Sequence, residues 1–201
     1  AAENAKTAGF DGVQLHGANG YLVDQFLRDK TNLRTDAYGG SPENRTRFMR
    51  EVLEALIDVW GADRVGIRLS PGGVFNDMHD SDPQRTFSYV LGELSKLELA
   101  YAHVTRVTAQ DIAHGATTGV GPKELRKDFK GVLITAGGFD RAQAEQAIAE
   151  GWADAVAYGV PFLANPDLPR RLQEGLALNT PDESTFYASG PKGYTDYPTA
   201  G

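Results

Sequence analysis

Residues 12–21 read GVQLHGANGY, an apolar run followed by a cluster of polar side chains. The first half of this segment has the length and composition of a β-strand, so the second half is expected at the strand's carboxyl end. Barrel enzymes of the α/β class place their chemistry at that end of their strands. The segment therefore predicts an α/β fold with a site directly after its first strand.

The polar half of this segment offers three candidate catalytic residues. His16 and Asn19 can hold a polarised carbonyl or nitro oxygen by hydrogen bonds, and Tyr21 can give up a proton. This combination suggests a site that activates an electron-poor double bond. The alternative is structural, with His16 packed or capping a helix and Tyr21 beginning the apolar face that continues through Leu22 and Phe26.

Four further apolar runs alternate with helical patterns, which is typical of parallel βα units. The expected strands are Gly12–His16, Val65–Ser70, Tyr101–Thr105, Val132–Ala136 and Ala155–Tyr158. Five strands do not close an eight-stranded barrel, but they would form its second half. An open doubly wound sheet is the alternative, and the lengths of the units do not decide between the two.

Apolar spacing and capping residues predict the longer helices. They run from Ser41-Pro42 to Gly61, from Asp82-Pro83 to Leu97, from Asp140 to Gly151 and from Asn165-Pro166 to Leu176. Residues 1–9 resemble the second half of a helix that ends at Gly9, with neither an initiator Met nor an N-cap. We therefore expect this chain to be the carboxyl-terminal part of a longer protein.

Strand alternation singles out Arg68. In Val65–Ser70 the apolar positions 65, 67 and 69 share one face, so Arg68 projects from the other face into a barrel interior. A guanidinium there, with no acid in its own strand, needs an anionic or electron-rich partner. The alternative is a structural salt bridge to an Asp or Glu elsewhere in the chain.

The last two strands end in glycine, at Ala136-Gly137-Gly138 and at Tyr158-Gly159. Glycine lets a phosphate approach backbone N–H groups, and barrels often bind phosphate after their last two strands. Either glycine turn alone is explained equally well as a tight βα connection. Two successive turns at this location favour a phosphate site.

Composition limits the possible functions. The 201 residues are 41% hydrophobic and 23% charged, which indicates an ordinary globular domain. The net charge of −7 argues against nucleic acid or an anionic membrane as partner, and the absence of cysteine excludes disulfides and thiolate sites. We expect a cytoplasmic location and, from four scattered histidines, no metal site.

The motifs along the chain form an ordered set. They comprise residues 9–22, 25–27, 32, 34–36, 38–41, 43–45, 64–71, 161–168, 186–187 and 193–198. This set resembles the carboxyl-terminal portion of the old yellow enzymes, FMN-dependent ene-reductases built on a (β/α)8 TIM barrel. The resemblance implies that residues 1–201 are the carboxyl-terminal part of one barrel domain, with strands four to eight present and strands one to three absent.

The resemblance also implies a reaction and its residues. NAD(P)H would reduce FMN, and flavin N5 would pass hydride to an activated C=C bond of an enone, enal or nitroalkene, with nitrate esters as further substrates. His16 and Asn19 would bind the activating oxygen, Tyr21 would supply the proton, and Arg68 would face the pyrimidine edge of the flavin. The remaining cofactor-binding residues would be Ala136, Gly137, Gly138, Tyr158, Gly159 and Tyr187.

One position departs from the family pattern. Family members often carry Arg after the glycine of the last strand, where it serves the phosphate, and this chain has Val160. Two other functions stay open. The first is a catalytically incomplete half-barrel, complemented by the missing amino-terminal half or by a second copy of the chain. The second is a phosphate-binding barrel isomerase without flavin.

Overall fold

The computed structural model describes residues 1–201, apart from the side chain of Gln110. Five parallel strands form one sheet in chain order: β1 Val13–Gly17, β2 Val65–Leu69, β3 Tyr101–Thr105, β4 Leu133–Ala136 and β5 Ala155–Ala157. All five expected strands are confirmed, with some ends moved by one residue. A doubly wound sheet reverses its strand order at a switch point, so the sequential order supports the barrel alternative.

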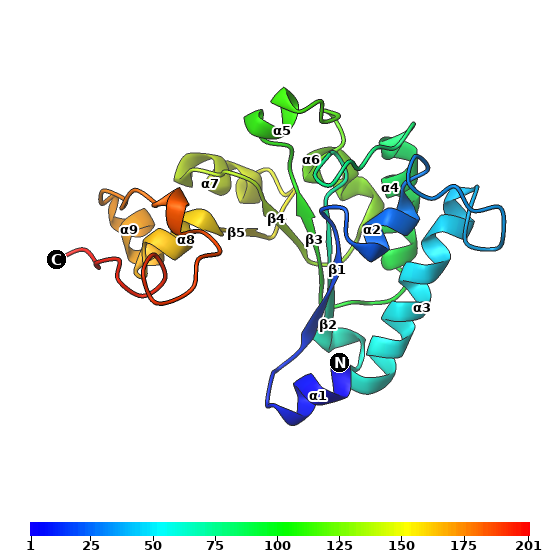
Figure 1. The fold of residues 1–201 in the computed structure, drawn as a ribbon, viewed down its shortest axis with the longest axis horizontal. Coiled ribbons are helices and arrows are strands. Elements are labelled where there is room, and N and C mark those ends of the chain that lie inside the picture. Colours follow the sequence, from blue (N-terminus) through cyan, green and yellow to red (C-terminus); the bar gives the residue numbers. More distant parts are fainter.

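Helices follow the strands and cover one side of the sheet. They are α1 Ala2–Thr7, α2 Leu22–Leu27, α3 Pro42–Trp60, α4 Pro83–Leu94, α5 Ala109–Ala113, α6 Pro122–Leu125, α7 Arg141–Ala149, α8 Val160–Ala164 and α9 Leu168–Glu174. Three short 3-10 turns, η1 Ala62–Arg64, η2 Arg126–Asp128 and η3 Glu183–Thr185, complete the described elements. Figure 1 shows α2, α3 and α4 beside the first strands, and α8 and α9 beyond β5.

The ends of α3 follow from its capping residues. The Ser41 side chain accepts a hydrogen bond from the N–H of Asn44, and Pro42 occupies the first turn, where its missing N–H costs nothing. Gly61 ends the helix with φ 81°, a backbone region that glycine adopts without steric strain. Both predicted ends of this helix are therefore confirmed.

Two other helices are shorter than predicted. Helix α4 ends at Leu94. Leu97 lies in the tight turn that follows, where its N–H donates to the carbonyl of Leu94. Helix α9 begins at Leu168, because Asn165 instead ends the short helix α8, which the sequence did not predict. The left-handed Gly175 (φ 67°) then ends α9 before the predicted boundary.

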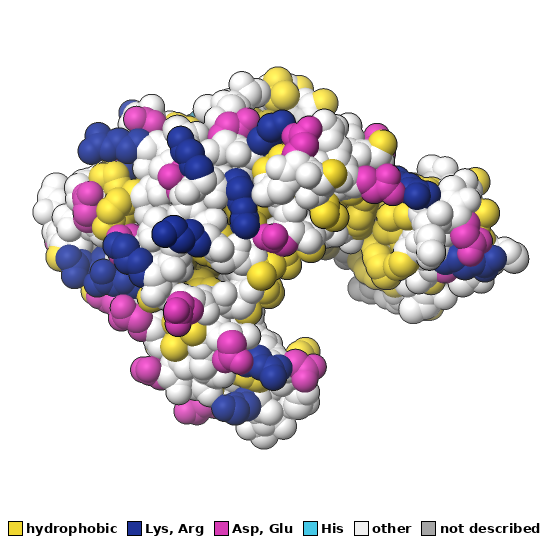
Figure 2. All heavy atoms as spheres, turned by 180° about the vertical axis from the view of Figure 1, so that it is seen from behind, with side chains coloured by type: hydrophobic (Ala, Val, Ile, Leu, Met, Phe, Trp, Pro, Cys, Tyr) yellow, Lys and Arg dark blue, Asp and Glu magenta, His cyan; other side chains and the backbone are white. Residues whose placement is uncertain are grey.

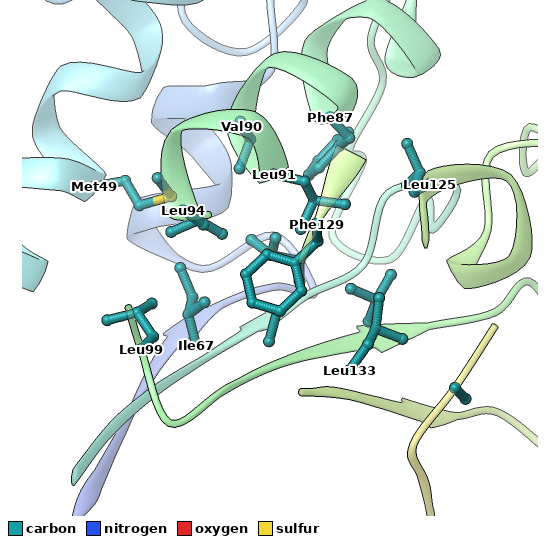
Figure 3. Packing of buried hydrophobic residues seen from close by; sticks show 14 of the residues in the cluster. Met49, Ile67, Phe87, Val90, Leu91, Leu94, Leu99, Leu125, Phe129 and Leu133 are labelled. Atoms are coloured by element: carbon teal, nitrogen blue, oxygen red, sulfur yellow. The ribbon is translucent and has the colours of Figure 1, made fainter. Parts of the chain in front are cut away.

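The core lies between the sheet and the long helices. Figure 3 shows Met49 of α3 and Leu94 of α4 beside Ile67 of β2, with Phe129 and Leu133 completing the layer. These side chains are almost fully buried. Removing such apolar area from water stabilises the fold by about 25 cal/mol per Å². The alternating apolar residues of β2 and β3 thus fix which face of the sheet meets the helices.

The opposite face of the sheet has no helices over it. Figure 2 shows a curved molecule, with hydrophobic side chains gathered along the inner side of the curve. Within residues 1–201, β1 and β5 each pair with one strand only, so both edges of the sheet are open. None of the described helices has the length and hydropathy needed to cross a membrane.

Candidate active site

Strand register brings three of the polar side chains into one row. His16 of β1 pairs with Arg68 of β2, which pairs in turn with His103 of β3. Their sequence neighbours on β2 and β3, such as Leu69 and Val104, are buried under the helices. Because side chains alternate along a strand, the row lies on the face without helices. The sequence placed Arg68 on this face, and register adds a histidine on each side.

Arg68 has no partner within the part of the chain that the structure describes: its guanidinium makes no hydrogen bond and no ion pair there. Burial lowers the pKa of this guanidinium, which nevertheless stays charged at neutral pH. The structural salt bridge considered from the sequence is therefore not formed among these residues. A half-buried cation without a partner is a binding group for an anion or an electron-rich ring.

His16 and Tyr21 lie together at the end of β1. Their ring centroids are 5.0 Å apart, and the Tyr21 side chain is 54% exposed. Burial and the charge of Arg68 lower the pKa of His16, with a smaller opposing effect from Asp24. His16 is therefore neutral at pH 7, which leaves one ring N–H as a hydrogen-bond donor.

Asn19 follows in the left-handed region, with φ 57°. Its backbone N–H donates to the Ser70 hydroxyl at 2.8 Å, and its carbonyl accepts from the Asn76 side chain at 2.9 Å. These two bonds hold a conformation that asparagine tolerates better than most residues. The backbone of Asn19 is thereby fixed from β2 and from the loop that follows it.

A buried ion pair supports this loop, and sequence reasoning missed it. The Asp24 carboxylate accepts from the N–H of Gly20 and from Arg28 Nε, each at 2.9 Å. Arg28 also donates to the carbonyls of Ser70 and Pro71. The spacing of four residues between Asp24 and Arg28 on one helix was a detectable signal. No sequence signal indicated that this pair contacts the end of β2.

His103 is only partly satisfied by hydrogen bonds. Its Nδ1 lies 3.4 Å from Gln14 Oε1. Nε2, however, is buried without a hydrogen-bond partner in the described chain. Burial, assisted by Arg68, lowers the pKa of His103 to about 4. No three described His, Asp or Glu side chains are grouped closely enough to hold a metal ion.

The glycine turns lie at the other end of the sheet. Ala136 pairs with Thr105 and with Ala157, and the chain then turns through Gly137 and Gly138 at φ 126° and 66°. A Cβ built on Gly138 would meet no atom within 4 Å, and the same holds for Gly159 after β5. The space over both turns is therefore open. Sequence reasoning missed Arg106, which donates to both carbonyls of the first turn.

Two aromatic candidates differ in their surroundings. The Tyr158 hydroxyl contacts the carbonyl of Asp140 at 3.4 Å, next to the first glycine turn, and burial raises its pKa. Tyr187 is 99% exposed at φ 60°. It belongs to the carboxyl-terminal segment, which Figure 1 shows beside α8 and α9 rather than beside β1. The structure thus brings Tyr158 to the glycine turns and leaves the role of Tyr187 a prediction.

Comparisons with known proteins agree with this geometry. Residues 1–179 match the NADH:flavin oxidoreductase / NADH oxidase family. A "Probable flavin mononucleotide-dependent alkene reductase" of Leishmania infantum is 49% identical over 98% of this chain and 53% of its own length. Morphinone reductase in complex with tetrahydroNAD is 46% identical, with a TM-score of 0.91 over 100% of this chain and 53% of its own.

The old yellow enzyme of Trypanosoma cruzi is a further structural match, 37% identical with a TM-score of 0.92 over 100% of this chain and 53% of its own. The resemblance seen in the sequence is therefore confirmed, and the five parallel strands correspond to part of a TIM barrel. The chain spans about half the length of the curated relatives it matches. A flavin-free isomerase has no support in these comparisons.

Proposed function

Because the chain belongs to the NADH:flavin oxidoreductase / NADH oxidase family, we propose that it forms the carboxyl-terminal part of an FMN-dependent ene-reductase. Residues 1–201 are then one part of a single barrel domain. The observation that carries this proposal is the row of His16, Arg68 and His103, with an unpartnered guanidinium between two neutral imidazoles. Its substrates are electron-poor alkenes, namely enones, enals and nitroalkenes, together with nitrate esters.

His16 and Asn19 bind the activating oxygen of the substrate in this proposal. That oxygen gains negative charge as the double bond is reduced, so hydrogen bonds to it strengthen in the transition state. The neutral His16 suits the task, because it donates without transferring its proton. The contacts of Asn19 with Ser70 and Asn76 support a preformed position, which avoids reorganisation during the reaction.

Tyr21 donates the proton to the α-carbon of the substrate. Its ring leans against His16, and more than half of its side chain is open to solvent, from which the phenol is reprotonated. The adjacent histidine orients the ring and leaves the hydroxyl available. The sequence alternative, an apolar helix face that begins at Tyr21, is weakened by this exposure.

The residues present fit FMN. Arg68 has the unpaired charge that the electron-rich edge of a flavin requires, and the open space over Gly138 and Gly159 suits a phosphate. The proposed cofactor-binding set is Arg68, Ala136, Gly137, Gly138, Tyr158, Gly159 and Tyr187. When bound, FMN supplies the hydride, and NADH or NADPH replenishes it.

The open edges of β1 and β5 require a partner in this proposal. Unpaired strand edges promote association, and the exposed Gln14 and His16 of β1 face the uncovered side of the sheet. The partner is the complementary amino-terminal half of the barrel or, in the alternative, a second copy of this chain that performs no turnover. A cytoplasmic location stays a prediction.

The test combines flavin binding with turnover. The chain is produced alone and together with the amino-terminal half of morphinone reductase, and each sample is titrated with FMN and then supplied with NADPH and 2-cyclohexenone. We expect one-to-one FMN binding and enone reduction in the complemented sample. His16→Ala and Asn19→Ala are each expected to lower kcat by about 10²–10³-fold. The exposed His79→Gln serves as control.

Three outcomes separate the alternatives. Dimers in light scattering, without turnover in the complemented sample, would support the inactive half-barrel. A complemented sample that binds FMN yet reduces no activated alkene would contradict the ene-reductase proposal, and one that binds no flavin would contradict both parts of it.

A further inference from the structure

Arg106 lies at the junction of β3 and the first glycine turn. Its backbone N–H donates to the carbonyl of Ala136 at 2.8 Å, which continues the ladder between β3 and β4 by one residue. Its guanidinium stacks on the ring of Phe139, 3.7 Å from the ring centroid. The backbone and the side chain of Arg106 are therefore both held against the turn.

The guanidinium binds two successive carbonyls of that turn. Arg106 Nε donates to the carbonyl oxygen of Gly137 and Nη2 to that of Gly138, each at 2.6 Å. Nη2 also reaches Gln143 Oε1 at 2.8 Å. Only glycine allows this approach, since a Cβ on Gly137 would lie 2.8 Å from both Cγ and the carbonyl oxygen of Arg106.

These contacts determine where the turn's N–H groups point. In a planar trans peptide the N–H lies opposite the carbonyl, so the N–H groups of Gly138 and Phe139 point away from Arg106. Neither donates a hydrogen bond to any residue that the structure describes. Successive free N–H groups in such a turn form an anion-binding concavity. A cation on the carbonyl side polarises both peptide units in the sense that favours an anion.

The other charges nearby make Arg106 the cation of this turn. Val160, after the second glycine turn, is uncharged. Arg141 is directed elsewhere, because it donates to the carbonyls of Leu172 and Gln173 at the end of α9. The Asp140 carboxylate, which caps α7, would repel a phosphate, and its field acts on Arg106.

We propose that Arg106 is a positioning residue for the phosphate of the flavin: it holds the Gly137–Gly138 turn with its N–H groups facing the ligand and offsets the charge of Asp140. This inference rests on the proposed function and adds a determinant of FMN over riboflavin, which differ only in that phosphate. In this proposal Arg106, directly after β3, supplies the positive charge near the phosphate that Val160 cannot supply.

The test compares the affinities of FMN and riboflavin, measured by fluorescence quenching in the complemented protein. Arg106→Gln is expected to weaken FMN binding about tenfold or more, the usual size for a hydrogen-bonded charged group, and to change riboflavin binding less than about twofold. Arg106→Lys keeps the positive charge but cannot bond both carbonyls as the planar guanidinium does, so this variant should bind FMN more tightly than Arg106→Gln and less tightly than the wild-type protein. Inorganic phosphate should compete with FMN in the wild-type protein and less so in Arg106→Gln.

Arg126→Gln is the matched control. Arg126 also donates to a glycine carbonyl, that of Gly131 at 2.8 Å, but before β4 rather than after it. Its replacement should leave the ratio of the two affinities unchanged. The inference would be overturned if Arg106→Gln weakened the binding of FMN and riboflavin equally, or weakened the binding of neither. If that variant does not fold, an unchanged ratio in Arg106→Lys overturns it, and a wild-type protein that binds neither flavin refutes the proposed function as well.

Discussion

The two ends of the sheet hold their polar groups in different ways. After β1, the loop that carries Asn19 is tied to β2 through Asp24, Arg28 and Ser70, whose exposed fractions are 0%, 2% and 3%. After β4, the turn at Gly137 is held by the partly exposed Arg106, and the N–H groups of Gly138 and Phe139 donate to no residue that the structure describes. The first end is thus preformed by the chain's own contacts, whereas the second has unpaired N–H groups, at which we propose that the phosphate of the flavin binds.

Replacing Asp24 tests the preformed end and has the largest expected effect. Asp24→Asn leaves the buried Arg28 charge without its counter-ion, which should lower the free energy of unfolding by about 3–5 kcal/mol. Urea denaturation followed by circular dichroism measures this loss. The exposed pair Arg50–Glu54 has the same four-residue spacing, so Glu54→Gln should change stability by less than about 0.5 kcal/mol. Equal losses in both variants would show that burial of the pair is unimportant.

Gly137→Ala tests the end of the sheet that carries the glycine turns. The new Cβ would collide with Arg106 and would require φ 126°, so we expect a loss of about 1–3 kcal/mol in the free energy of unfolding. Gly92 is the matched control, because it lies inside α4 with no atom within 4 Å of a built Cβ. Gly92→Ala should stabilise the protein by about 0.5–1 kcal/mol. The same sign in both variants would contradict the close packing of Arg106.

His103 lies between the two ends of the sheet, and its lowered pKa predicts that the stability of the fold depends on pH. Its pKa is about 4 in the folded chain, against the ordinary histidine value of 6.5 in an unfolded chain, so the unfolded state binds the proton first as pH falls. The free energy of unfolding therefore decreases by about 1–3 kcal/mol as the pH falls from about 6.5 to about 4, after allowance for the partial exposure of His103.

Urea midpoints at pH 7.5 and 4.5 measure this loss. His103→Gln removes the titrating group, so its stability should decline less over that range than that of the wild-type protein. His79→Gln, which alters an exposed histidine, should decline as the wild-type protein does. Identical declines in all three proteins would mean that His103 is not shielded from solvent.

Tyr21→Phe has the smallest expected effect on stability. The hydroxyl makes no hydrogen bond to a described residue, and the ring keeps its contact with His16, so the change should be below about 0.5 kcal/mol. Thermal unfolding measures it. A loss of more than about 1 kcal/mol would favour the structural interpretation of Tyr21 over its role as proton donor.

Much of the fold was predictable because its signals are local. The alternation in Val65–Ser70 follows from the period of a strand, and the cap at Ser41 and the stop at Gly61 follow from backbone groups within a few residues. The prediction failed where helix ends depend on their surroundings. Asn165 ends one helix instead of beginning the next, and its side chain bonds the carbonyl of Pro161 and the N–H of Asn179, which lies 14 residues further along the chain.

The sequence by itself determined the family, the order of the βα units and the face on which Arg68 lies. Motifs, and the alternation of apolar and polar residues along a strand, depend only on residues that are neighbours in the chain. Only the tertiary structure decided that Arg68 lies between His16 and His103, and that Arg106 holds a turn 31 residues away in the chain. The reason is register. A slip of one residue between parallel strands would exchange the two faces, and packing of the apolar face against α3 and α4 prevents it.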